Sequence, residues 1–331
     1  MEQLVCGTQA SKFLRIGFLF AAIALSVLVS QPSQANQTDP SLVIIDTGID
    51  SSLSIFQDRL IYEVCLLDWY LCPNGRTFQE GVGSATLRGA IANLNGFDHG
   101  TQMASIAVTR YPQLKFIFIR IVANNAYGNR LSVSNENVGK ALEWVQLNRE
   151  KFNIRAVSMS QGTHQLLSGA RYCPSIPSVQ KMVTHLKLDG VAIFFPVGNQ
   201  GDKKRIDWPA CIPDSVSIGA VNEKDEIPSY SNMDFSATDM YALGNTVAIV
   251  PGGKTINASG TSISTQIAAV QWIQFATKHP EASYSQIFQA LRTSGKLVFD
   301  KDYRFGRKID LEAALAKYEA TTTLGSAASA S

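Results

Sequence analysis

Short apolar segments rich in β-branched residues alternate with helical patterns along most of this chain of 331 residues. The segments that read as buried strands are residues 41–46, 115–122, 154–160, 191–196 and 215–221. Helices are predicted at residues 99–109, 135–147, 178–188, 262–278, 283–293 and 310–318. Strands that alternate with helices form βαβ units, which place parallel strands in one sheet and helices on both of its faces. The chain is therefore predicted to contain one α/β domain.

The first 35 residues have the pattern of a secretory signal peptide. Lys12 and Arg15 supply a basic region, residues 16–30 are mostly apolar, and residues 33–35 offer small side chains before a cleavage point. The apolar run is shorter than the roughly 20 residues that span a bilayer, although an uncleaved anchor is the alternative. We expect a mature protein from Asn36 onward that is secreted or periplasmic and has no stable membrane span.

The cysteines agree with export to an oxidising compartment. Cys6 belongs to the signal segment, and the others are Cys65, Cys72, Cys173 and Cys211. Four cysteines allow three pairings, of which we favour Cys65–Cys72 and Cys173–Cys211 because they are close in sequence. Their spacing does not fit a tetrahedral zinc site, and no metal ligands are predicted.

Three polar residues stand at the ends of predicted elements. Asp46 ends a strand in Ile-Ile-Asp-Thr-Gly, His99 opens a helix in Asp-His-Gly-Thr, and Ser262 opens another in Gly-Thr-Ser-Ile. Taken singly they read as a turn aspartate, a structural histidine and an N-cap serine. Taken together they provide a carboxylate to orient an imidazole, an imidazole to accept a proton and a hydroxyl to attack a carbonyl carbon.

A fourth segment, Val-Gly-Asn-Gln-Gly at residues 197–201, follows a buried strand and ends in a glycine-rich turn. An exposed amide at Asn199 is able to donate hydrogen bonds to a developing oxyanion. The ordinary alternative is a turn asparagine.

These four segments resemble those of subtilisin-family serine proteases (subtilases), and the resemblance covers residues 42–315. The order Asp, His, Ser is that of subtilisins, and the absence of Gly-x-Ser-x-Gly around Ser262 argues against an α/β-hydrolase. The resemblance implies a three-layer α/β fold with a mostly parallel central sheet, spanning residues 36–318. It also implies a secreted serine endopeptidase in which Ser262 attacks, His99 transfers the proton and Asp46 orients His99. Asn199 and the Ser262 N–H would hold the oxyanion.

The resemblance also extends to substrate binding. The residues it assigns there are Ser160, Gln161, Gly162, Gly198 and Asp207. Peptide would add as a strand along residues 160–162, and Asp207 would lie near the floor of the S1 pocket. A buried carboxylate there favours Lys or Arg at P1. The alternatives are a solvated loop aspartate, or one neutralised by the basic residues 203–205.

The chain departs from the family at several points. Gln102 and Gln266 stand where family members usually carry His and Pro. Many secreted members carry a folded propeptide, whereas residues 36–40 are too few to fold. The protein would then fold unaided, or an inhibitor or folding partner would act in trans. Residues 319–331 lack apolar periodicity and are expected to be a disordered tail.

The sequence also allows functions other than a protease of peptide or protein substrates. A catalytically silent subtilase fold used for binding or as a scaffold is the main alternative, followed by a sedolisin-like acid peptidase and an esterase. No cofactor is required for the expected chemistry, and a structural calcium is left open. The net charge of +2 is too small to indicate nucleic acid as a partner.

Overall fold

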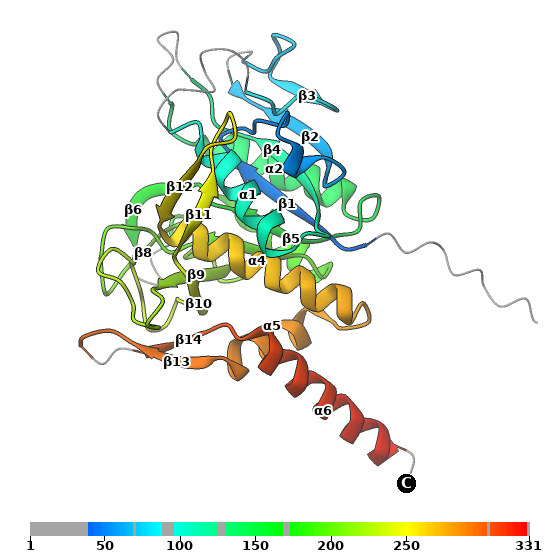
Figure 1. Ribbon diagram of the computed structural model, residues 1–331, viewed down its shortest axis with the longest axis vertical. Helices are drawn as coiled ribbons and strands as arrows, with labels where there is room; N and C mark the ends of the chain where they lie inside the picture. Colours follow the sequence, from blue (N-terminus) through cyan, green and yellow to red (C-terminus); the bar gives the residue numbers. More distant parts are fainter. Residues whose placement is uncertain are drawn as a thin grey trace, which may run out of the picture. The chain divides into compact units, whose positions relative to one another are not determined.

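A ten-stranded sheet forms the centre of the fold in the computed structural model (Figure 1). The structure describes residues 39–68, 71–87, 96–124, 130–167, 173–302 and 305–329, all within one compact unit. The expected signal peptide, residues 1–35, lies outside the described residues. Within them no helix is both long and apolar enough to cross a bilayer.

The sheet is mostly parallel. Its strands are β1 (Ser41–Asp46), β2 (Leu60–Leu66), β3 (Phe78–Glu80), β4 (Lys115–Arg120), β5 (Ile154–Met159), β7 (Ala192–Pro196), β9 (Val216–Val221), β10 (Met240–Leu243), β13 (Lys296–Phe299) and β14 (Phe305–Lys308). They are arranged in the order β13-β14-β10-β9-β7-β5-β1-β4-β2-β3. Only the outermost pairs, β2–β3 and β13–β14, are antiparallel. The predicted α/β class is confirmed, and β1 lies near the middle with its carboxyl end at Asp46.

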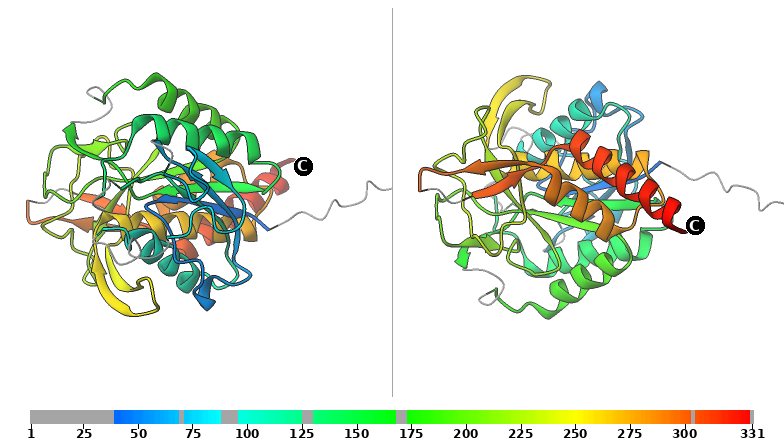
Figure 2. Two further views of the ribbon diagram at one scale, coloured as in Figure 1. Left: turned by 90° about the horizontal axis from the view of Figure 1, so that it is seen from above. Right: turned by 90° about the horizontal axis from the view of Figure 1, so that it is seen from below.

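Helices cover both faces of the sheet and complete three layers (Figure 2). They are η1 (Ser54–Phe56), α1 (His99–Arg110), α2 (Asn135–Asn148), α3 (Pro177–Leu188), α4 (Thr261–Lys278), α5 (Tyr284–Ser294) and α6 (Leu311–Ser329). Helices α2 and α3 pack on one face, whereas α1, α4, α5 and α6 belong to the core on the other face. The central helix α4 runs beneath β5, β7 and β9 and is buried along most of its length.

The apolar runs in the sequence form strands because both of their faces are buried. In β1, Leu42 and Ile44 join the core on the α4 side, while Val43 and Ile45 join the core on the α2 side. Side chains of a strand point alternately to opposite faces, so a strand covered on both sides must be apolar at nearly every position. This is why the inner strands were predicted within a few residues.

Two small antiparallel sheets and two disulfides lie outside the main sheet. The small sheets pair β6 (Thr163–Leu167) with β8 (Ile206–Trp208) and β11 (Asn245–Ile249) with β12 (Thr255–Ser259). The disulfides are Cys65–Cys72 and Cys173–Cys211, which is the predicted pairing.

The expectation of a disordered tail from residue 319 is corrected by the structure, because α6 continues to Ser329. Glu319 forms ion pairs with Lys278 and His279 at the end of α4, at 2.9 and 3.1 Å. The hydroxyls of residues 321–323 donate to backbone carbonyls three or four positions earlier, which satisfies these polar side chains within the helix. The ion pairs of Glu319 and the hydrogen bonds within the helix thus accompany a helical segment whose composition alone gives no apolar stripe.

Candidate active site

Asp46 and His99 form a hydrogen-bonded pair at the carboxyl end of the central strands. The Asp46 side chain is fully buried, whereas the His99 side chain is 24% exposed. Nδ1 of His99 lies 2.8 Å from Oδ1 and 3.0 Å from Oδ2 of Asp46. An ionised carboxylate only accepts hydrogen bonds, so Nδ1 is the protonated ring nitrogen in the neutral imidazole. Nε2 then carries the lone pair that a general base needs.

The turn after β1 holds the start of α1 in place. Thr47 Oγ1 donates to the Phe97 carbonyl at 3.0 Å and accepts from the Gly100 N–H at 3.0 Å. A Cβ on Gly100 would lie 2.2 Å from the Gly48 carbonyl oxygen, so only glycine allows this approach. The close contact explains why His99, at the first position of α1, reaches the end of β1.

Ser262 is the second residue of α4 and is partly exposed in a cavity of about 190 Å³ that His99 also lines. Its carbonyl accepts from Ser160 Oγ at 3.2 Å. In the described part of the chain, no hydrogen bond joins Ser262 Oγ to His99. Such bonds are often long without substrate and tighten in the Michaelis complex. In the first turn of α4, the N–H groups of Thr261 and Ile263 are hydrogen-bonded to Asn199 and Gly260. The dipole of the helix favours negative charge at this end of the cavity.

Asn199, in the loop after β7, is tied to the start of α4 through its amide oxygen. Oδ1 accepts from the Thr261 N–H at 2.8 Å and from Thr261 Oγ1 at 3.0 Å. The N-cap residue Gly260 has no side chain, so Asn199 replaces it in satisfying a first-turn N–H. With its oxygen bound to Thr261, the donor end of the side chain is Nδ2, and Asn199 lines the same cavity as Ser262.

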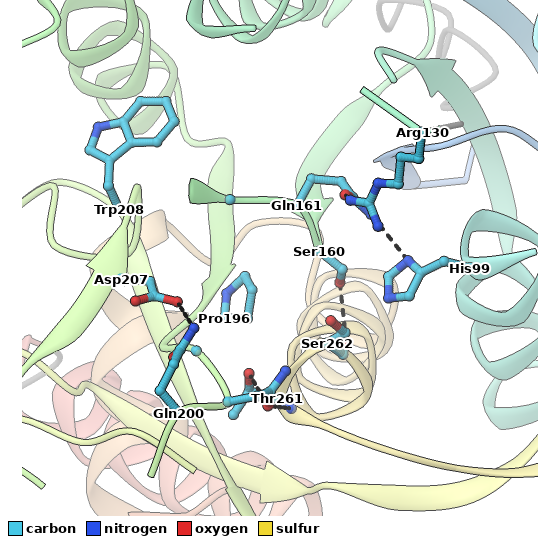
Figure 3. A pocket seen from close by; sticks show the side chains of 13 residues that line it. His99, Arg130, Ser160, Gln161, Pro196, Gln200, Asp207, Trp208, Thr261 and Ser262 are labelled. Carbon is cyan, nitrogen blue, oxygen red and sulfur yellow. Dashed lines mark hydrogen bonds between the residues drawn. The ribbon is translucent and has the colours of Figure 1, made fainter. Parts of the chain in front are cut away.

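Asp207 lines the other end of the cavity and is 6% exposed (Figure 3). Its Oδ2 accepts from Gln200 Nε2 at 3.0 Å, and Gln200 Oε1 in turn accepts from Asn232 Nδ2 at 2.6 Å. Gly198 has a φ of +106°, and a Cβ there would lie 2.4 Å from Asp207 Oδ2, so glycine is required beside this carboxylate.

Two of the basic residues that follow Gln200, Lys203 and Arg205, have carbonyl or carboxylate partners. Arg205 forms an ion pair with Asp202 at 2.6 Å, and Lys203 donates to the carbonyls of Pro228 and Ser231. Burial alone would raise the pKa of Asp202, but hydrogen bonds from Arg205 and from the Lys204 N–H outweigh it and lower that pKa.

The segment after β5 lies between the end of the cavity at His99 and the end at Asp207. Ser160, Gln161 and Gly162 all line the cavity. Gln161 is 3% exposed, and its side chain turns toward His99 (Figure 3) and lies within hydrogen-bond distance of Asp46. Arg130 also lines the cavity and donates to Gln161 Oε1.

Three polar residues of the site were not found from the sequence, namely Arg130, Gln200 and Asn232. Gln200 follows Asn199 directly and was within the segment singled out, so its position offered a signal. Arg130 and Asn232 carry no local motif, and only the tertiary fold brings them to the site.

The structure shows the surroundings of Gln102 and Gln266, the two residues that depart from the family pattern. Gln102 donates to Asp98 Oδ2 at 2.7 Å. Gln266 is fully buried in α4, and neither of its amide atoms has a hydrogen-bond partner among the described residues. Within the described ranges, no group of His, Cys, Asp and Glu side chains is arranged to hold a metal ion.

An α/β fold with Asp46, His99 and Ser262 at one edge of a parallel sheet defines a subtilisin-like architecture. Residues 37–308 match the Subtilase family, and the chain belongs to that family.

Individual relatives agree with this assignment. The chain is 24% identical over 278 residues to subtilisin amylosacchariticus of Bacillus subtilis subsp. amylosacchariticus, which covers 82% of this chain and 65% of that protein. It is 24% identical over 279 residues to a subtilisin of Bacillus pumilus, covering 82% and 90%. The chain thus spans about two thirds of the length of the first relative.

Solved structures share the fold at low sequence identity. A mutant of the protease domain of PatA, a patellamide maturation protease, superimposes with a TM-score of 0.68 at 17% identity, covering 87% of this chain and 98% of that one. A cold-adapted subtilisin-like serine proteinase gives a TM-score of 0.61 at 20% identity, covering 83% and 88%.

Proposed function

We propose that this protein is a serine endopeptidase with Ser262 as nucleophile, His99 as general base and Asp46 as the residue that orients His99. The observation that carries the proposal is the Asp46–His99 pair, with Nδ1 at 2.8 Å from Oδ1, in one cavity with a serine at the N-terminus of α4. Family membership supports the same reaction class.

In the proposed reaction, His99 Nε2 takes the proton of Ser262 Oγ as the oxygen attacks the scissile carbonyl carbon. The proton then passes to the leaving amine, which leaves an acyl-enzyme. His99 next takes a proton from a water molecule as that water attacks the acyl carbon, and it returns the proton to Ser262 Oγ as the acid product leaves. Asn199 Nδ2 and the Ser262 N–H would donate to the oxyanion of each tetrahedral intermediate, where one such donor is worth about 10²–10³ in rate.

Peptide would bind in extended conformation along residues 160–162. Main-chain hydrogen bonds of this kind bind an extended backbone largely regardless of its sequence. The proposed substrates are therefore proteins or peptides with an accessible extended segment.

The finer proposal is a preference for Lys or Arg at P1, supported by the burial of Asp207 and by Arg205 being paired with Asp202. A charged pair in a desolvated pocket loses several kcal/mol when one partner is truncated, about 2–5 kcal/mol. We expect Asp207→Asn to lower kcat/KM for Arg p-nitroanilides by about 10²-fold and to leave Phe and Leu substrates within a few-fold. Equal use of basic and apolar P1 residues by the wild type would contradict this proposal.

Export is proposed on the basis of the two disulfides and the N-terminal pattern. We expect the protein in the periplasm or the medium, with residues 1–35 removed. N-terminal sequencing of the protein recovered from each fraction tests this, and full-length protein in the cytoplasm would contradict it.

Labelling with a fluorophosphonate probe at neutral pH tests the main proposal. We expect covalent labelling of the full chain at Ser262, found by peptide mapping, and none in Ser262→Ala. Ser264→Ala is the matched control, since Ser264 lies in the same helical turn but is fully buried. A folded wild-type protein that does not label would favour the catalytically silent binding protein.

A further inference from the structure

Gln161 contacts both members of the Asp46–His99 pair. Its Nε2 lies 2.7 Å from Asp46 Oδ1 and 3.1 Å from His99 Nδ1. Gln161 is 3% exposed and Asp46 is fully buried, so this amide covers the carboxylate on the side of the cavity.

Arg130 determines which way the Gln161 amide faces. A guanidinium group has only donors, so the atom it contacts must be the amide oxygen, Oε1. The amide nitrogen then faces Asp46, which is the orientation that donates to a carboxylate. Arg130 thus donates to Gln161 (both labelled in Figure 3), and Gln161 donates in turn to the Asp46 carboxylate.

The hydrogen bonds that Asp46 accepts show how Gln161 affects the carboxylate. Oδ1 accepts from the Thr47 N–H at 2.7 Å, from Gln161 at 2.7 Å and from His99 at 2.8 Å. Because Nδ1 donates its proton to Asp46, it cannot also accept from Gln161, so the Gln161 hydrogen belongs to Oδ1. Donors from three directions fix the plane of the carboxylate, and that plane sets the direction of the imidazole.

We propose that Gln161, oriented by Arg130, is a positioning residue that fixes the Asp46 carboxylate and keeps water away from its hydrogen bond to His99. This inference rests on the proposed protease function and concerns the same site. Gln161 does not touch substrate atoms in this role; it acts through Asp46. Its effect should therefore appear in kcat more than in KM.

Two substitutions separate donation from packing. Gln161→Met keeps the length and approximate volume of the side chain but removes the donor. Gln161→Glu keeps the shape most closely but places a second carboxylate against Asp46. We expect kcat to fall about 10- to 100-fold in Gln161→Met, the effect of one hydrogen bond to a charged group, with KM within about twofold. We expect Gln161→Glu to be slower still, because like charges repel.

Gln102→Met is the matched control. Gln102 also donates to a carboxylate at 2.7 Å, but its acceptor is Asp98 and not Asp46. We expect this variant to keep kcat within about threefold, on p-nitroanilide peptides carrying Arg, Lys, Phe or Leu at P1. Arg130→Met should give a smaller loss than Gln161→Met, since it removes only the group that orients the amide.

Proton NMR of the full chain gives a readout that does not need turnover. The Nδ1–H of His99, assigned with a His99→Ala variant, should give a low-field resonance in the wild type. It should broaden by exchange with water in Gln161→Met and remain in Gln102→Met. Thermal unfolding of each variant checks that the domain is folded.

The outcomes distinguish the two proposals. Unchanged kcat and unchanged resonance in Gln161→Met would overturn the positioning role. A Gln161→Glu variant close to wild type beside an impaired Gln161→Met would overturn it too, because shape alone would then explain the effect. A wild type without peptidase activity, whose resonance is nevertheless lost in Gln161→Met, would retain the positioning of His99 and refute the protease function.

Discussion

Replacing Asn199 by Asp or by Ala separates the hydrogen bonds that its side chain accepts from α4 from its proposed role as an oxyanion donor. Its Oδ1 accepts from the backbone and the hydroxyl of Thr261 at 2.8 and 3.0 Å and thereby caps α4. Its Nδ2 is the proposed oxyanion donor. Asn199→Asp keeps an oxygen for Thr261 and loses the donor, whereas Asn199→Ala loses both.

The expected magnitudes differ between the two variants. Loss of a helix cap costs about 1 kcal/mol, and for a domain of this size that lowers Tm by about 2–4 °C. Asn199→Ala should show this loss, together with a fall in kcat of about 10²- to 10³-fold. Asn199→Asp should keep the wild-type Tm or exceed it slightly, because a negative charge at a helix N-terminus is favourable by about 0.3–1 kcal/mol. Its kcat should fall further than in Asn199→Ala, since a carboxylate would face the developing oxyanion.

Steady-state kinetics on a peptide p-nitroanilide and thermal unfolding measure the two effects on the same preparations. Asn257→Asp is the control, because it makes the same change at an exposed position on β12. A kcat for Asn199→Asp within tenfold of wild type would refute the oxyanion assignment. Equal losses of Tm in the two variants would refute capping through Oδ1.

Two further predictions concern stability. Hydrogen bonds from Lys296 and then Lys308 lower the pKa of Asp225 below its usual 3.8, so the folded state gains stability at any pH above that value and loses it as the pH falls through the lowered pKa. We expect Asp225→Asn to cost about 0.5–1 kcal/mol at pH 7, a modest value because the Lys296 side chain is 68% exposed and the Lys308 side chain is 31% exposed. The difference from wild type in urea unfolding should shrink as the pH falls below 3.8 and through the lowered pKa. The disulfides Cys65–Cys72 and Cys173–Cys211 close loops with separations of 7 and 38 residues, which in the chain-entropy account are worth about 2.4 and 3.9 kcal/mol. Double Ser variants should therefore differ by about 1.5 kcal/mol in unfolding free energy, and equal losses would contradict the loop-length argument.

The sequence predicts the inner strands well and the outer ones poorly, for a physical reason. Strand β1 is apolar throughout because helices cover both of its faces. Strand β2 was missed because it contains Glu63, a buried carboxylate whose oxygens accept from the N–H groups of Gly83 and Ala85. A charged residue inside an apolar run breaks the pattern unless its partners are known. Those partners lie about 20 residues further along and are brought near only by the fold.

The residues of the candidate site also fall into two groups. Some are predictable from a local motif, and others are recognised only from contacts between distant parts of the sequence. Asp46, His99 and Ser262 stand at element ends with small neighbours, and the close approach at Gly100 shows why those neighbours are needed. Gln161 has no such signature, because its partners come from residues 31, 62 and 115 positions away.

A glutamine after a buried strand predicts only a polar end to that strand. Its significance arises when the fold places a carboxylate and a guanidinium on opposite ends of the same amide. The amide cannot then be reversed without setting donor against donor at Arg130 and acceptor against acceptor at Asp46. In an isolated peptide the amide could take either orientation. Here it is held in the one that directs its N–H toward the Asp46 carboxylate.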